Sequence, residues 1–130
     1  GALEREAVSL LLAEQLGEAG AAQALRLGGT LPAAVRWLSR QRGPFTSDPE
    51  WVVQRFRSWF SPLLERWWRI LEPVERDALQ RASQGTTEGE VAGVVPALIE
   101  RGLLVRDTDG VSPNGQVLAD FAQRWSEPVS

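Results

Sequence analysis

Residues 103–112 read Leu-Leu-Val-Arg-Asp-Thr-Asp-Gly-Val-Ser, and this stretch decides the fold expected for the C-terminal half of the chain. A short apolar run, an Asp-Gly turn and a second short run of strand-forming residues are typical of a β-hairpin. Three helical segments precede the hairpin and one follows it. Helices and a hairpin in that order form a winged helix-turn-helix, which the sequence predicts for residues 71–130.

Start and stop signals place the helices around the hairpin. Glu72-Pro73 begins the first helix, which is expected to end near Gln84-Gly85. Thr87-Glu88-Gly89-Glu90 matches a capping box and predicts the start of the second. The third is expected within residues 92–101, and Ser112-Pro113 is expected to cap the last. The side chains that this last helix would bury are Val117, Leu118, Phe121 and Trp125.

The N-terminal half is expected to form a helical, lid-like subdomain over residues 1–70. Apolar residues at three- and four-residue spacing predict a first helix over residues 3–17, broken at Gly17 and Gly20. A short helix over residues 21–27 follows. The stripe that the first helix would bury is Leu3, Ala7, Leu10, Leu11 and Leu16.

Residues 28–32, Gly-Gly-Thr-Leu-Pro, join this short helix to the next one. The glycine pair is typical of a helix C-terminus. Thr30 is expected to cap the following helix, with Pro32 in the first turn, where its missing N–H costs nothing. That helix is expected to run to about Arg42. The residues that it would bury are Val35, Leu38 and Trp37.

Four of the six tryptophans lie within residues 51–68. Residues 43–47 are expected to form a loop, Asp48-Pro49 to begin a helix and Ser61-Pro62 to begin another. The four indoles fall on the apolar faces of these two helices. Their spacing favours core and inter-subdomain packing, and the alternative is a protein-docking surface. The four residues are Trp51, Trp59, Trp67 and Trp68.

The composition excludes several kinds of chemistry. The 130 residues suit one compact domain or two very small ones, and they include no His, Cys, Lys, Tyr or Met. Zinc sites and histidine acid–base catalysis therefore have no ligands or bases, and a phosphate-binding P-loop lacks its lysine. We expect no enzyme activity in this chain. Nothing resembles a signal peptide or a membrane span, so we expect a cytoplasmic protein with no membrane contact.

Charge is distributed unevenly along the chain. Residues 31–70 carry seven Arg and three acidic residues, a net +4, whereas residues 71–130 carry five Arg and ten acidic residues, a net −5. The expected recognition helix has Pro96 in its middle and Arg101 only at its end. An acidic winged helix lacks the electrostatic attraction to phosphates that supplies most DNA affinity. DNA reading is therefore the less favoured expectation, and packing against protein the more favoured one.

Several segments together resemble a known protein family. Gly28-Gly29-Thr30-Leu31-Pro32-Ala33-Ala34 resembles the Gly-Leu-Pro-Leu-Ala motif that begins a lid helix in STAND-type NTPases, the AAA+-related signal-transduction class that includes NB-ARC switches. Residues 3–7 resemble the start of the first lid helix. Residues 71–76 resemble the opening of the winged helix, and residues 100–104 its approach to the wing. The stretch 45–69 fits only as additional lid helices.

The resemblance implies a non-catalytic regulatory piece of a larger bacterial NTPase. In that family the motif proline packs on the base and sugar of ADP, which points to Pro32, with Gly29 and Leu31 beside it. The implied partner is the nucleotide-binding core of the same full-length chain, which would hold ATP or ADP; a homo-oligomer or another protein is a further possible partner. The simpler interpretation of Pro32 is a first-turn proline.

This sequence departs from the family at one motif. Many members place Met-His-Asp near the last winged-helix helix, where this chain has Pro113-Asn114-Gly115 and no histidine. The resemblance also implies a hinged movement between lid and winged helix. Residues 43–47 and the joint at Glu72-Pro73 are the expected hinges. The alternative functions are a DNA-binding transcription regulator and an adaptor that uses the Trp-rich helices.

Overall fold

The computed structural model describes residues 2–124, which are mainly helical with one two-stranded sheet near the C-terminus. The N-terminal helices are α1 (Ala2–Gly28), α2 (Pro32–Leu38), α3 (Arg42–Ser47) and α4 (Pro49–Ile70). The remaining elements are α5 (Pro73–Ser83), the 3₁₀ helix η1 (Gly89–Gly93), α6 (Val95–Glu100), β1 (Leu104–Asp107), β2 (Gly110–Pro113) and α7 (Gln116–Arg124).

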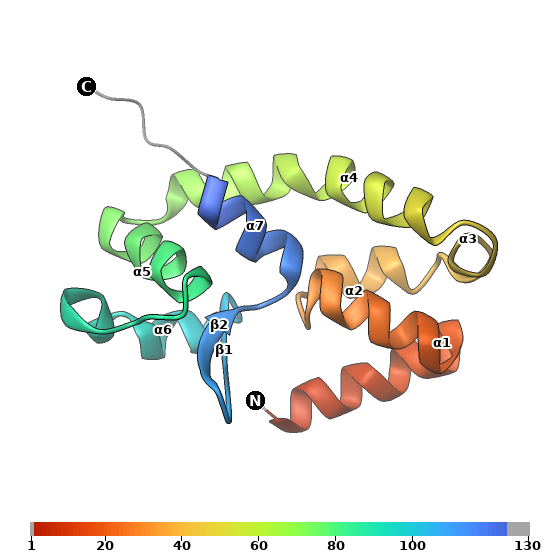
Figure 1. Ribbon diagram of the computed structural model, residues 1–130, viewed down its shortest axis with the longest axis horizontal. Coiled ribbons are helices and arrows are strands. Elements are labelled where there is room, and N and C mark those ends of the chain that lie inside the picture. The colour runs from red at the N-terminus through yellow and green to blue at the C-terminus, as the bar shows by residue number, and fades with distance from the viewer. Residues whose placement is uncertain (1, 125–130) are drawn as a thin grey trace.

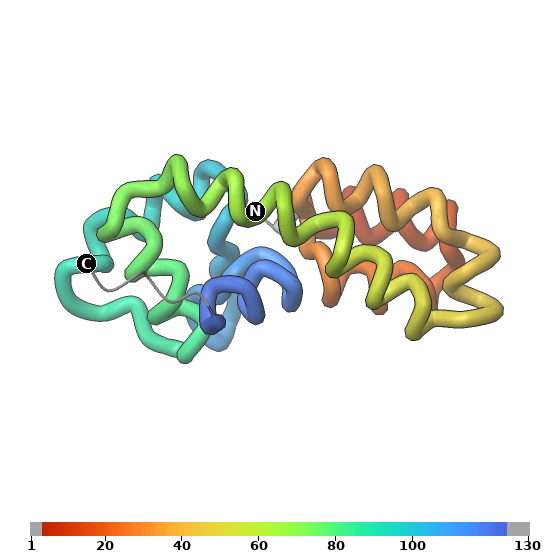
Figure 2. The backbone as a smooth tube through the Cα atoms, turned by 90° about the horizontal axis from the view of Figure 1, so that it is seen from above, coloured from red at the N-terminus to blue at the C-terminus, as the bar shows by residue number. Residues whose placement is uncertain are grey.

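These elements gather into two halves that share one long helix. In Figure 1, α1, α2 and α3 lie toward one end of an elongated molecule, α5 and α6 lie at the other, and the hairpin lies between α6 and the beginning of α1. Helix α4 runs across both ends, as the view from above in Figure 2 also shows. The order helix, short helix, helix, hairpin and helix after α4 is that of the predicted winged helix-turn-helix.

Helix α1 is broken at Gly17, as the sequence predicts, and its two parts fold back beside each other (Figure 1). Gly17 has a φ of 79°, which lies outside the helical region and suits glycine. Gly20 stays helical, so the second predicted break is wrong. The predicted stripe is also wrong in part: Leu12 and Leu16 are buried, but Leu10 and Leu11 are 68% and 47% exposed.

The reversal explains which side of the first part of α1 is covered. The residues that face the rest of the protein recur every four positions, from the half-buried Val8 through Leu12 to Leu16. Ala7 is exposed with Leu10 and Leu11 because these residues lie off that side. The side chain of Leu3, the remaining member of the predicted stripe, lies outside the described part of the structure.

Residues 42–47 form helix α3, so the predicted loop at 43–47 is wrong. Helix α2 also ends at Leu38, earlier than predicted. Phe45 is 7% exposed and packs toward α1, and this burial outweighs the low helix propensity of Gly43. The hydroxyls of Thr46 and Ser47 donate to backbone carbonyls four residues earlier, each at 3.1 Å.

Helix α4 continues without a break through Pro62, which corrects the predicted second start at Ser61-Pro62. Its beginning is as predicted: the Asp48 carboxylate accepts a hydrogen bond from the backbone N–H of Trp51 at 3.2 Å. Pro62 is exposed, so the hydrogen bond that it cannot donate is missing on the solvent side. The buried stripe continues past it at four-residue intervals: Val52, Phe56, Phe60, Leu64 and Trp68.

The winged helix differs from the prediction at three of its boundaries. The capping box predicted at Thr87 is not formed: residues 89–93 make only a 3₁₀ helix without a side-chain cap, and they begin and end with glycine. Pro96 lies in the first turn of α6 and not in its middle. Pro113 ends strand β2, so α7 begins at Gln116 and not at Ser112-Pro113. Trp125, which was expected on α7, lies outside the described residues.

The predicted start of α5, the hairpin and the burial of Val117 and Leu118 are confirmed. Helix α5 begins after Glu72 with a capping box, in which the Glu75 side chain accepts from the Glu72 N–H at 2.8 Å. The two strands pair antiparallel from Leu104 with Pro113 to Asp107 with Gly110. Val117 and Leu118 are buried, and the half-buried Phe121 packs its ring edge-on against Trp68 at 5.6 Å.

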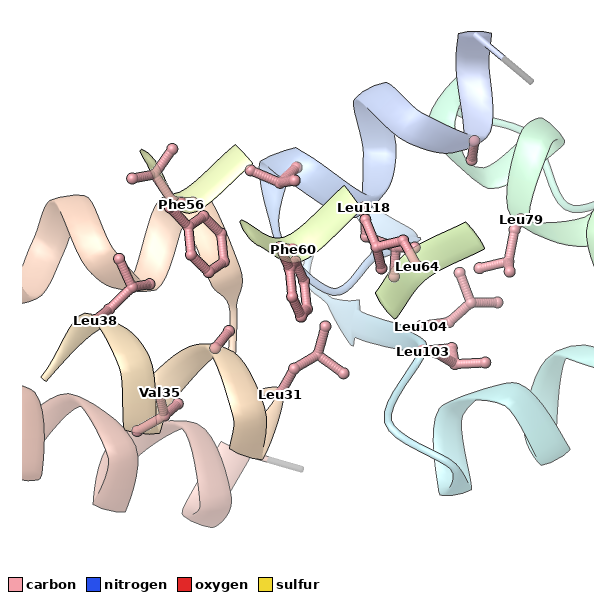
Figure 3. Packing of buried hydrophobic residues seen from close by; sticks show 14 of the residues in the cluster. Leu31, Val35, Leu38, Phe56, Phe60, Leu64, Leu79, Leu103, Leu104 and Leu118 are labelled. Carbon is pink, nitrogen blue, oxygen red and sulfur yellow. The ribbon is translucent and has the colours of Figure 1, made fainter. Parts of the chain in front are cut away.

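One continuous hydrophobic core joins the two predicted subdomains. In Figure 3, Phe56 points toward α2, while Phe60 and Leu64 lie farther along α4 toward the winged helix. Leu31 from the helical half and Leu103 from the winged half approach the same central region (Figure 3). Helix α4 therefore supplies core residues to both halves. Within residues 2–124, no helix combines the length and the apolar composition that a membrane crossing requires.

Candidate functional site: the Gly28–Pro32 turn and its groove

The turn at residues 28–32 is built for close approach of another backbone. Helix α1 ends at Gly28, and Gly29 has a φ of 61°, with its N–H donating to the Leu25 carbonyl at 2.8 Å. A Cβ atom on Gly28 would lie 2.7 Å from that of Ala34, so α1 and α2 meet without room for a side chain. A Cβ atom on Gly29 would collide with the side chain of Asn114.

Asn114 is the central polar residue of this site. It is 1% exposed, and its side chain makes three hydrogen bonds, all of them to residues in other segments of the chain. Its Oδ1 accepts from the Thr30 N–H at 3.0 Å, and its Nδ2 donates to the Thr30 hydroxyl at 3.0 Å and to the Gly102 carbonyl at 2.7 Å. Thr30 and Asn114 are 84 positions apart in the sequence. This pair therefore connects the helical half directly to the winged helix.

The prediction that Thr30 caps α2 is wrong. Leu31 occupies the cap position, with no side-chain hydrogen bond to the helix, and Pro32 follows in the first turn. The Thr30 hydroxyl instead accepts the hydrogen bond from Asn114. A long-range polar contact has thus replaced the local one, because the two segments meet where both side chains are buried.

Gly115 completes the contact from the winged-helix side. Its φ is 105°, and a Cβ atom there would lie 2.7 Å from the carbonyl carbon of Gly28. No other glycine has its Cβ position so close to backbone atoms, apart from Gly29 opposite it, among the described residues. We call the contact of residues 28–30 with Asn114 and Gly115 the Asn114 latch.

Beside the latch lies a groove of about 270 Å³ that spans both halves of the molecule. Leu31 and Pro32 form one wall, the end of α4 forms another, and Arg101 and Leu103 close it from the winged helix. Pro32 is exposed at this groove, and Ile70 on the facing wall is 74% exposed. The remaining wall residues are Trp67 and Leu71. We call this the Pro32 groove.

The Pro32 groove is largely apolar with one charged corner. The Arg101 guanidinium lies 2.8 Å from the Glu75 carboxylate, and its side chain remains 48% exposed. An arginine in this position suits a ligand or partner surface that carries an anionic group near an apolar or planar one. Among the described residues, no group of three or more acidic side chains is arranged to hold a metal ion.

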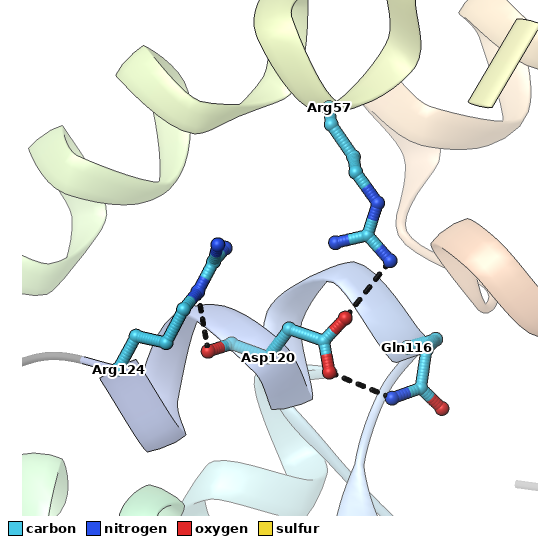
Figure 4. Close-up of polar contacts among 4 residues, drawn as sticks. All are labelled: Arg57, Gln116, Asp120 and Arg124. Carbon is cyan, nitrogen blue, oxygen red and sulfur yellow. Dashed lines mark hydrogen bonds and ion pairs between the residues drawn. The ribbon is translucent and has the colours of Figure 1, made fainter. Parts of the chain in front are cut away.

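Two further contacts brace the halves against each other. Arg57 on α4 lies 2.8 Å from Asp120 on α7, whose other carboxylate oxygen accepts from the Gln116 amide at 2.8 Å (Figure 4). Arg76 donates to the carbonyls of Trp68 and Arg69 at 2.8 and 3.1 Å, across the joint at Glu72-Pro73. Both places that the sequence suggested as hinges are thus structured: one is helix α3, and the other is bridged.

The predicted site residues fall into three environments. Pro32, Leu31 and Trp67 meet in the Pro32 groove, whereas Gly29 faces Asn114. Trp51 and Trp59 line a second groove, and Trp68 is a core residue with 1% exposure. The sequence singled out Asn114 only as part of Pro113-Asn114-Gly115, where the family motif is absent, and gave it no role. Its signal was weak: it is the one asparagine in the chain, in an Asn-Gly pair that also suits an ordinary turn.

The winged helix offers little positive charge where a DNA-reading element would need it. Helix α6 has six residues, Val-Pro-Ala-Leu-Ile-Glu, and none is basic. At the tip of the hairpin, Asp107 and Asp109 are exposed, and Arg106 is the neighbouring cation. These carboxylates would face phosphates unfavourably.

Comparison of the chain with protein-family models, with curated proteins and with solved structures gives no significant match.

Proposed function

We propose that this chain is the lid and winged-helix part of a bacterial STAND-type NTPase of the cytoplasm, and that it couples nucleotide state to effector or oligomer contacts. The observation that carries the proposal is the Pro32 groove. Its walls come from both halves, so a group bound there contacts the helical half and the winged helix at once. The nucleotide itself would be held by a P-loop core elsewhere in the full-length chain.

The groove has the chemistry that this role needs. Pro32 presents an exposed, rigid, apolar ring for a base or sugar, and Trp67 and Leu31 extend the apolar wall. Arg101 stands at the winged-helix corner, where it can share its guanidinium between Glu75 and an incoming anion. The site is shallow and carries no triphosphate-binding loop, so this chain would complete a nucleotide site and not form one alone.

The Asn114 latch changes how the signal would be transmitted. The latch, the Arg57–Asp120 pair and the shared helix α4 tie the two halves together. In this arrangement the lid and the winged helix move as one body when the nucleotide site closes or opens. Opening between the halves would first require the buried Asn114 hydrogen bonds to break, which makes the latched form a defined resting state.

Calorimetry with the isolated chain tests whether the nucleotide is held by the P-loop core and not by this chain alone. We expect no heat of binding for ADP or ATP at concentrations up to about 100 μM, because the apolar groove supplies too few contacts for that affinity. Binding of either nucleotide to this chain alone with a micromolar Kd would overturn the division between core and lid.

A proline pair tests the role of Pro32 in the full-length protein. Pro32→Ala should lower the retention of ADP by the purified protein several-fold, whereas Pro73→Ala should leave it unchanged. Pro73 is the matched control because it is also an exposed first-turn proline but lies outside the groove. Equal ADP retention in the two variants, with both folded, would refute a nucleotide contact by Pro32. The absence of P-loop and Walker B sequences upstream would refute the family assignment.

The DNA-binding alternative has less support from the geometry. Its arginine-bearing element would have to be the helical half, because α6 carries no base-contacting cation. A salt-dependent shift of arbitrary duplex DNA at low ionic strength would favour this alternative over the regulatory one.

A further inference from the structure

A second groove, of about 510 Å³, follows the seam between α2 and α4 on the helical half. Two of its tryptophans are the most exposed in the described structure: Trp51 is 40% and Trp59 is 39% exposed. Nothing in the proposed nucleotide role uses this surface. The groove is lined by Trp37, Gln41, Trp51, Arg55, Ser58 and Trp59. We call it the tryptophan groove.

Neighbouring side chains cover part of each tryptophan ring in the groove. Trp59 stacks on Trp37 at 5.7 Å between ring centres and on Phe60 at 5.8 Å. The Arg55 guanidinium lies 5.5 Å from the centre of the Trp51 ring. The faces that Trp37 and Trp59 turn to each other, and the Trp51 face beneath Arg55, are therefore not open to a partner. This arrangement disfavours stacking of nucleic-acid bases, which needs free aromatic faces.

The ring edges carry hydrogen-bond donors that the protein leaves unused. No hydrogen bond among the described residues engages the indole N–H of Trp37, Trp51 or Trp59. A groove lined by aromatic residues with N–H donors of this kind suits a segment whose backbone carbonyls lack internal partners. A polyproline II helix is such a segment, because it has no internal hydrogen bonds and exposes its carbonyls.

The spacing of the groove also suits this conformation. Trp51 and Trp59 are eight residues apart on α4, so their backbone positions are separated by about 12 Å along the helix axis at 1.5 Å per residue. One turn of polyproline II contains three residues and rises about 9 Å. The length of one such turn is thus comparable to the spacing of these two positions along α4, and Trp37 lines the same groove.

Charge around the groove indicates the composition of the segment. Arg55 lines the groove, and two exposed arginines flank Trp37 in the sequence, Arg36 on α2 and Arg40 in the turn after it. Residues 31–70 carry a net charge of +4. Complementary charge on a partner is acidic. We propose that the tryptophan groove binds a proline-rich, acidic segment of a partner protein in the polyproline II conformation.

Titration of the whole chain with short peptides tests the proposal. The probe is a blocked peptide of three Glu-Pro-Pro repeats, followed by tryptophan fluorescence and by calorimetry. The comparison peptides are three Glu-Gly-Gly repeats, which keep the charge but not the conformation, and three Lys-Pro-Pro repeats, which reverse the charge. We expect saturable binding of the Glu-Pro-Pro peptide with a Kd below about 1 mM, and binding at least about tenfold weaker for the other two.

Substitutions locate the binding surface. Trp51→Ala and Arg55→Glu should each weaken Glu-Pro-Pro binding by about tenfold or more, a loss typical of an interface anchor. Arg66→Glu is the matched control because this exposed arginine lies on the same helix and outside the groove. Arg66→Glu should change the Kd for the Glu-Pro-Pro peptide by no more than about twofold, because it changes the net charge but no side chain in the groove.

Each remaining outcome decides against the proposal. No saturation by the Glu-Pro-Pro peptide, or equal binding of the Glu-Gly-Gly peptide, would overturn it, since the conformation would then not matter. An equal loss in Arg55→Glu and Arg66→Glu would show attraction by net charge alone. Tighter binding of an oligothymidylate than of any peptide, abolished by Trp51→Ala, would identify a single-stranded nucleic-acid surface instead.

Discussion

Replacement of Asn114 by alanine should destabilise the whole chain and not only its winged helix. The substitution removes the three side-chain hydrogen bonds to Thr30 and Gly102 at a position that is 1% exposed. It leaves the Thr30 N–H and the Gly102 carbonyl without these partners, and a buried unsatisfied group costs about 1–3 kcal/mol. We therefore expect the free energy of unfolding to fall by about 2–6 kcal/mol, a large part of the stability of a small domain.

Urea unfolding followed by circular dichroism and by tryptophan fluorescence measures this loss. Because the hydrophobic core is continuous across both halves, the two signals should coincide, and the midpoint should fall at an unchanged m-value. Gln123→Ala is the matched control: it removes an exposed amide that donates to the Ser83 carbonyl at 3.0 Å. The control should change stability by no more than about 0.5 kcal/mol.

A double-mutant cycle separates the latch from general loss of packing. Thr30→Ala removes one hydroxyl acceptor, and combination with Asn114→Ala should reveal a coupling energy of about 0.5–3 kcal/mol. Additive effects of the two substitutions, or an Asn114→Ala loss no greater than that of Gln123→Ala, would refute our reasoning about the latch.

Three further changes test other parts of the structure, each by urea unfolding. Gly115→Ala should cost at least about 1–3 kcal/mol more than Gly85→Ala, because both glycines have positive φ but only Gly115 approaches the backbone of Gly28. Equal losses of stability in the two variants would contradict a close approach of Gly115 to the Gly28 backbone. Phe45→Ala should cost about 3–5 kcal/mol if residues 42–47 are a packed helix, and under about 1 kcal/mol if they are a surface loop. Pro62→Ala should raise stability by about 1–3 kcal/mol, since α4 is continuous there; a loss would indicate a helix start at this proline.

The winged helix could be predicted from the sequence because its signals are local. Glu72-Pro73, Gln84-Gly85 and the Asp107–Gly110 turn each specify a backbone conformation through one or two residues. The errors lie where tertiary burial overrides such signals. Gly43-Pro44 favours a loop, but Phe45 needs a buried position, and the helix that provides one prevails.

Pro62 and the Asn114 latch show the same limit in different ways. Local rules treat a proline as a helix start, but they do not reveal that this one faces solvent while the buried stripe continues beneath it. The latch joins residues 84 positions apart, and no periodicity or spacing connects them. Pro32 was singled out by resemblance, and its place at a groove shared by two halves required the three-dimensional arrangement.

The shared helix α4 limits how a chain of this kind can be divided or recombined. Cutting after residue 70 would remove Phe121 of α7 from the Trp68 ring against which it packs, and would separate the winged helix from the helix that contributes to its core. Recombination that exchanged only residues 71–130 would place a winged helix against an α4 surface whose side chains do not match it. We therefore expect chains related to this one to retain α4 and the winged helix together, with glycines at positions 28 and 29 opposite Gly115.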